Sequence, residues 1–141
     1  NLTPLHGHTA LFGVYGMLGI GLMLFCLRGL RPQMRWPEGL LRGAFWAMNI
    51  GLALMALLTL LPMGVLQLNA ALEHGYWFAR SAEFMNRPII DMLVWMRVPG
   101  DTIFSVGAVL LGWFVLRQWI LPARDPDYDR AIAEGQAEGE F

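Results

Sequence analysis

Residues 9–27 read TALFGVYGMLGIGLMLFCL and contain no charged side chain. A membrane-spanning helix needs about 20 predominantly apolar residues, and residues 5–28 supply them. Two further apolar stretches follow at residues 40–66 and 101–121. The sequence therefore predicts an all-α integral membrane protein, with about three transmembrane helices that belong to a larger helix bundle. Four glycines in the first helix indicate close packing against a neighbouring helix, namely Gly13, Gly16, Gly19 and Gly21.

The composition supports this class of protein. Apolar residues make up 56% of the 141 residues and charged residues only 15%, whereas soluble domains carry about 25% charged residues. The net charge of −1 argues against nucleic acid as a partner, since such proteins are strongly basic. A single cysteine, Cys26, excludes an internal disulfide framework.

Charged residues between the apolar stretches predict the orientation in the membrane. Four arginines follow the first helix and precede the core of the second: Arg28, Arg31, Arg35 and Arg42. Short loops rich in arginine lie in the cytoplasm, so we place this loop there. The mixed segment 69–100 then lies at the opposite membrane face. The acidic tail 125–141 is predicted to be cytoplasmic and solvated, with at most a short helix.

Prolines and polar residues predict where the helices end. Pro62 is expected to kink the second helix or to end its regular part. In the interfacial segment, Pro88 fits the first turn of a short helix, which we expect to end at residues 98–100. Asp101 or Thr102 is then expected to cap the third helix.

Two histidines lie at the edge of the first helix, where ionisable side chains are costly and usually functional. Each residue of a helix turns by about 100°, so His6 and His8 are expected to point about 200° apart. Side chains on opposite faces cannot share one metal ion. The spacing favours two separate partners, and two haems bound through axial imidazoles fit it. Hydrogen bonds from both rings to neighbouring carbonyl groups are the alternative.

Three stretches together resemble one protein family. They are residues 5–16 (LHGHTALFGVYG), 73–81 (EHGYWFARS) and 97–102 (RVPGDT). They resemble the nitric oxide reductase branch of the haem–copper oxidase superfamily, and most closely its quinol-dependent bacterial form. The resemblance covers nearly all of the chain except the tail.

The resemblance implies a role for each of several residues. His6 would be the axial ligand of a high-spin haem b, and His8 would be one axial ligand of a low-spin haem b. Asp101 would lie at the quinol site, with capping of the helix as the alternative. The enzyme would reduce two NO molecules to N2O and water with electrons from quinol. Arg80 and Arg97 are candidates for pairing with haem propionates, with anchoring at the membrane interface as the alternative.

The resemblance also implies what surrounds the chain. The non-haem iron of this family needs three histidines and a glutamate from earlier helices. The sequence begins Asn1-Leu2-Thr3 without Met, and we expect it to be the C-terminal part of the catalytic subunit. Its partners would be the rest of that subunit, membrane quinol and lipid of the bacterial inner membrane. The sequence does not decide whether the protein forms a homodimer.

Two other functions stay open from the sequence. The first is the cytochrome-c-dependent nitric oxide reductase, in which Asp101 would have no quinol role. The second is a membrane anchor or assembly subunit without redox chemistry, which would tolerate replacement of His6 and His8.

Overall fold

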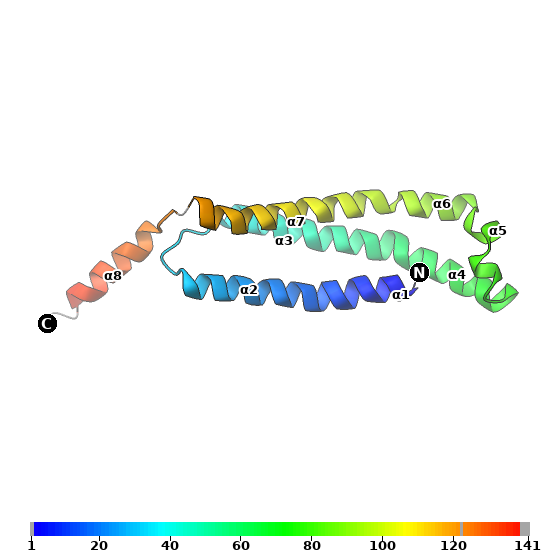
Figure 1. The fold of residues 1–141 in the computed structure, drawn as a ribbon, viewed down its shortest axis with the longest axis horizontal. Helices are drawn as coiled ribbons and strands as arrows, with labels where there is room; N and C mark the ends of the chain where they lie inside the picture. Colours follow the sequence, from blue (N-terminus) through cyan, green and yellow to red (C-terminus); the bar gives the residue numbers. More distant parts are fainter. Residues whose placement is uncertain (1, 122, 139–141) are drawn as a thin grey trace.

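Three long helical segments dominate the computed structural model, which describes residues 2–121 and 123–138. They cover residues 2–30, 38–74 and 88–120, and each is long and apolar enough to cross a membrane. They run alongside one another along the long axis of the molecule (Figure 1). The predicted all-α fold with three apolar helices is therefore confirmed.

The first segment comprises α1 (Leu2–His6), a π-helix η1 (Gly7–Gly16) and α2 (Met17–Leu30). It extends beyond the predicted bounds 5–28 at both ends. None of its described residues is buried, and it runs along one side of the other two segments (Figure 1). Most of its surface is therefore available for lipid or for other parts of a larger protein.

The second segment comprises α3 (Glu38–Leu54), a π-helix η2 (Met55–Leu60) and α4 (Leu61–His74). The helix continues past the end of the predicted span at residue 66, and Pro62 does not end it. Proline lacks an N–H and its ring crowds the preceding turn. The wider turn of η2, in which the Leu61 amide donates to the Ala56 carbonyl, precedes it and lets the helix continue. Gly75 ends the segment with φ +91°, a conformation that favours glycine.

Short helices connect the second and third segments: η3 (Phe78–Arg80), α5 (Ala82–Met85) and α6 (Pro88–Trp95). The Ser81 hydroxyl accepts a hydrogen bond of 3.2 Å from the Phe84 amide and so caps α5. Pro88 lies at the start of α6, as predicted. The second helix extends into the predicted interfacial segment, 69–100, as far as His74.

The last long helix, α7 (Arg97–Ile120), follows α6 after Met96 alone. Residues 98–100 were expected to end a helix and instead form the first turn of α7. Pro99 is tolerated there because the first amides of a helix have no intrahelical partner. The expected cap at Asp101 or Thr102 is therefore wrong, and Thr102 instead donates a 2.8 Å hydrogen bond to the Val98 carbonyl.

Helices α3 and α7 pack closely where glycine removes the side chain. A Cβ atom at Gly51 would lie 2.5 Å from the Phe104 nitrogen, and one at Gly107 would lie 2.7 Å from the Met48 nitrogen. Small residues allow such close crossings of membrane helices. This pair has the most extensive contact in the bundle and positions the first turns of α7.

The tail forms a helix, α8 (Pro126–Glu138), which is longer than the predicted short helix. The Asp125 carboxylate accepts a 3.1 Å hydrogen bond from the Asp127 amide, and acidic residues stabilise the N-terminus of a helix. The residues before α8 pair with the arginine-rich loop. The Asp125 amide donates to the Gln33 carbonyl at 2.8 Å, and the Arg35 amide donates to the Ala123 carbonyl at 2.9 Å.

Candidate cofactor-binding site

A cavity of about 730 Å³ lies between the first segment, the α3–η2 junction and the start of α7. Three residues that the sequence singled out line it: His8, Arg97 and Asp101. Its other walls are mostly apolar and include Leu11, Phe12, Leu52, Met55 and Phe104. Cofactor sites in proteins are typically apolar cavities of about 300–1,000 Å³ with a few polar groups. The cavity therefore has the size and lining of a site for a planar organic group.

The ring of His8 is oriented by the turn before it. Its Nδ1 lies 2.8 Å from the Pro4 carbonyl oxygen. Because a carbonyl only accepts hydrogen bonds, Nδ1 carries the proton and Nε2 keeps a free lone pair. Histidines that bind metals commonly donate their other N–H to a carbonyl in this way. The hydrogen bond expected as an alternative role for His8 is thus present, and it leaves the lone pair of Nε2 available to a ligand.

The backbone around the histidines is unusual. His8 lies in the π-helix η1, a form that is rare and frequently found at functional sites. Gly7 also lines the cavity, and a Cβ atom there would meet nothing within 4 Å. The surface beside His8 is therefore open enough to admit a bulky group.

His6 faces different surroundings. It is the last residue of α1, is exposed and does not line the His8 cavity. Its carbonyl accepts a 3.3 Å hydrogen bond from the Thr9 hydroxyl, whereas its imidazole ring makes no hydrogen bond or ion pair with the described residues. Any partner of His6 must therefore approach from outside this part of the chain.

Asp101 and Arg97 form an ion pair one turn apart on α7. The Arg97 Nε lies 3.0 Å from Asp101 Oδ2 and 3.2 Å from Oδ1. Both side chains are less than half exposed, at 42% and 44%, so the pair contributes less than about 1 kcal/mol to stability. Its main effect is to fix the direction of the Asp101 carboxylate inside the cavity.

Arg80 lies apart from that cavity, although at the same end of the bundle as α1 and α4 (Figure 1). Its Nη2 donates a 2.7 Å hydrogen bond to the Tyr76 hydroxyl. The guanidinium also lies 4.4 Å from the centre of the Tyr76 ring. Both residues line a separate cavity of about 400 Å³ near Thr3. The structure therefore does not bring Arg80 together with His8 and Asp101.

Sequence reasoning missed the aromatic wall of the cavity. Phe12 and Phe104 meet edge to face with ring centres 4.9 Å apart. The helical spacing predicts that both rings lie near the site, since Phe12 follows His8 by one turn and Phe104 follows Asp101 by one turn. Residues one turn apart share a helix face.

The sequence matches a known family model. Residues 1–103 match the family described as Cytochrome C and Quinol oxidase polypeptide I. The chain belongs to this family. The match includes all five residues that the sequence singled out, His6, His8, Arg80, Arg97 and Asp101, and ends within α7. Members of this oxidase family are membrane oxidoreductases that bind haems and metal ions. A comparison with curated proteins found no match.

Proposed function

We propose that the chain is the C-terminal part of the catalytic subunit of a quinol-dependent nitric oxide reductase in the bacterial inner membrane. The observation that carries the proposal is one cavity, lined by both His8 and Asp101, in a member of the quinol oxidase polypeptide I family. The three stretches that resemble the nitric oxide reductase branch add to it.

Each histidine would hold one haem b. His8 would bind the low-spin haem iron through Nε2, with the ring fixed by the 2.8 Å contact between Nδ1 and the Pro4 carbonyl. His6, whose imidazole ring makes no hydrogen bond or ion pair with the described residues, would bind the high-spin haem from the other side of the helix. When bound, the haems supply electron transfer from quinol and the iron at which NO is reduced.

Asp101 would act on the quinol. A carboxylate oxygen can accept the proton of a quinol hydroxyl group as the quinol is oxidised. Arg97 would hold that carboxylate in place through the contacts of 3.0 and 3.2 Å. The apolar side chains of Phe12, Leu52 and Phe104 in the same cavity suit the ring and tail of a membrane quinol.

The rest of the catalytic machinery would come from other parts of the subunit. The described residues contain no group of three or more His, Cys, Asp or Glu side chains that could hold a metal ion. The non-haem iron and the second axial ligand of the low-spin haem therefore belong, in this proposal, to earlier helices of the complete protein.

A comparison of electron donors tests the proposal. The complete subunit is reconstituted in liposomes, and NO and O2 consumption are measured with a reduced quinol or with reduced cytochrome c. We expect quinol to support NO reduction and a quinol-analogue inhibitor to stop it. Turnover with cytochrome c alone would contradict the quinol assignment and favour the cytochrome-c-dependent reductase. Consumption of O2 without NO reduction would reject the nitric oxide reductase itself.

A further inference from the structure

A second cavity, which the proposed function does not use, lies at the arginine-rich end of the bundle between α2 and α3. Its volume is about 490 Å³. Most of its wall is apolar and comes from three helices, with Met17, Ile20, Leu24, Leu41, Met48 and Leu111. Its charged lining residues come from the last turn of α2 and the first turns of α3, namely Arg28, Glu38 and Arg42. The cavity is thus apolar along the helices and charged at one end.

The two arginines at this end lack acidic partners. Neither Arg28 nor Arg42 forms an ion pair with a described residue. The Arg28 guanidinium donates a 3.3 Å hydrogen bond to the Met34 carbonyl and lies 5.3 Å from the centre of the Trp36 ring. These neutral contacts hold the group in place and leave its charge uncompensated. With Glu38 as the only acidic lining residue, the end of the cavity favours an anion.

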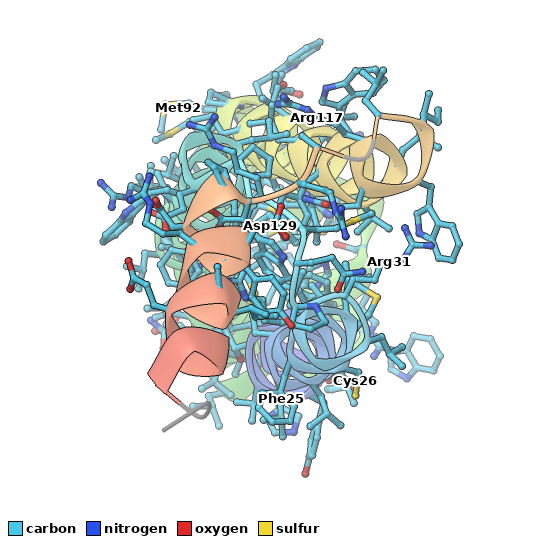
Figure 2. All side chains as sticks on the ribbon, turned by 90° about the vertical axis from the view of Figure 1, so that its left-hand side faces the viewer. Phe25, Cys26, Arg31, Met92, Arg117 and Asp129 are labelled. Carbon is cyan, nitrogen blue, oxygen red and sulfur yellow. The ribbon has the colours of Figure 1, made fainter. Side chains whose placement is uncertain are left out.

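Further charged residues surround this end of the cavity. Arg31 contacts the end of α7 through a 3.2 Å hydrogen bond to the Gln118 carbonyl, and an adjoining cavity is lined by Arg28 and Arg117 together with Asp125 and Asp127. In Figure 2, Phe25 and Cys26 lie on the outer side of α2, away from α3 and α7, and both are exposed. This end of the helices therefore combines a surface for acyl chains with cations at the membrane boundary.

We propose that this cavity binds one anionic phospholipid, with an acyl chain between α2 and α3 and the phosphate between Arg28 and Arg42. Basic pockets between transmembrane helices recognise anionic headgroups, and guanidinium groups bind phosphate in a fork. An apolar protein helix in the same place would leave both guanidinium groups without partners. Charge complementarity therefore favours the lipid.

Native mass spectrometry of the complete subunit tests this site, with lipids added as phosphatidylglycerol or phosphatidylcholine. We expect one phosphatidylglycerol to be retained preferentially. The double variant R28Q/R42Q should weaken its retention by about 25-fold, since each arginine near a membrane surface contributes about fivefold. The control is Arg130→Gln, which removes one positive charge on α8 where Arg130 pairs with Asp127 at 3.4 Å. This control should retain the lipid as the wild type does.

Two further variants test the two parts of the site separately. Ile20→Trp adds bulk to the apolar wall and keeps both arginines, so lipid retention should fall although the charge is unchanged. Glu38→Gln removes the acidic lining residue and should strengthen retention. Thermal melting of each variant checks that it is folded. Equal retention of the two lipids, or retention unchanged in the folded R28Q/R42Q protein, would overturn the proposal. Displacement of phosphatidylglycerol by millimolar inorganic phosphate would overturn the assignment to a lipid.

Discussion

His8, Arg97 and Asp101 line one cavity, and the last two form an ion pair one turn apart on α7. The sequence singled out His8 and the RVPGDT stretch, and the cavity confirms that His8 and Asp101 lie near each other, while their roles toward haem and quinol stay predictions. The ion pair between Arg97 and Asp101 was missed, because a helix break was expected at residues 98–100. With α7 starting at Arg97, the two residues lie one turn apart and pair. A wrong helix boundary thus hid a contact that the spacing would otherwise predict.

Asp101→Asn tests the proposed proton acceptor. The amide keeps the size of the side chain and cannot accept a proton from quinol at neutral pH. We expect quinol-driven NO reduction by the complete subunit to fall by about 100-fold or more, with the haem spectrum unchanged. Asp91→Asn, an exposed carboxylate on α6, is the control and should keep its activity. Unchanged quinol oxidation in the Asp101 variant would remove Asp101 from the quinol site.

Arg97→Gln separates two roles of the arginine. If Arg97 orients Asp101, its loss should raise the KM for quinol by up to about fivefold, because a partly exposed ion pair contributes less than about 1 kcal/mol. The midpoint potential of the low-spin haem should stay constant. A clear shift of that potential would instead assign Arg97 to a haem propionate. Redox titration and steady-state kinetics on the same preparation distinguish the two.

Among the helices, apolar runs predicted the number and order of spans, whereas their ends depended on local backbone features. The mixed segment that starts at residue 69 was expected at a membrane boundary, and α4 continues through its first residues to His74. The sequence did not show which glycines lie at a close helix crossing. It predicted close packing at the glycines of the first helix, whereas the close crossing of α3 and α7 occurs at Gly51 and Gly107.

Gly107→Ala tests the crossing of α3 and α7. The added methyl group would meet the Met48 Cγ at 2.6 Å and its backbone nitrogen at 2.7 Å. Overpacking of this kind costs about 1–3 kcal/mol, so the melting temperature of the complete subunit in detergent should fall. Gly112→Ala is the matched control on the same helix, since its methyl group meets nothing within 4 Å. Equal melting temperatures for both variants would contradict the close crossing.

In the whole molecule, the bundle has two chemically distinct ends. The His8 cavity, α4 and the short helices lie at one end, and the arginine-rich loop and α8 lie at the other (Figure 1). The sequence predicted that the arginine-rich loop and the tail lie at one end and the segment 69–100 at the other, because consecutive spans cross the membrane in alternating directions. The length of α8 could not be predicted, because it depends on the cap at Asp125 and on pairing of residues 123–125 with the loop.

Cysteine labelling tests the orientation in intact cells. In a Cys26→Ser background, Trp77→Cys introduces a thiol at a position where the native side chain is 86% exposed. This position lies at the end proposed to face the periplasm. A membrane-impermeant maleimide should label it without permeabilising the inner membrane. Asp129→Cys on α8 should be labelled only after permeabilisation. The reverse pattern would invert the proposed orientation.

The most direct test of the central claim, that His6 and His8 bind two different haems, is a reduced-minus-oxidised optical spectrum of the complete subunit. We expect His8→Ala to lose the low-spin haem signal and keep the high-spin signal, and His6→Ala to do the reverse. His74→Ala is the control, because its ring stacks on Phe78 at 4.8 Å, and it should keep both signals. Loss of both signals together in either folded variant, or retention of both in His8→Ala, would contradict the claim.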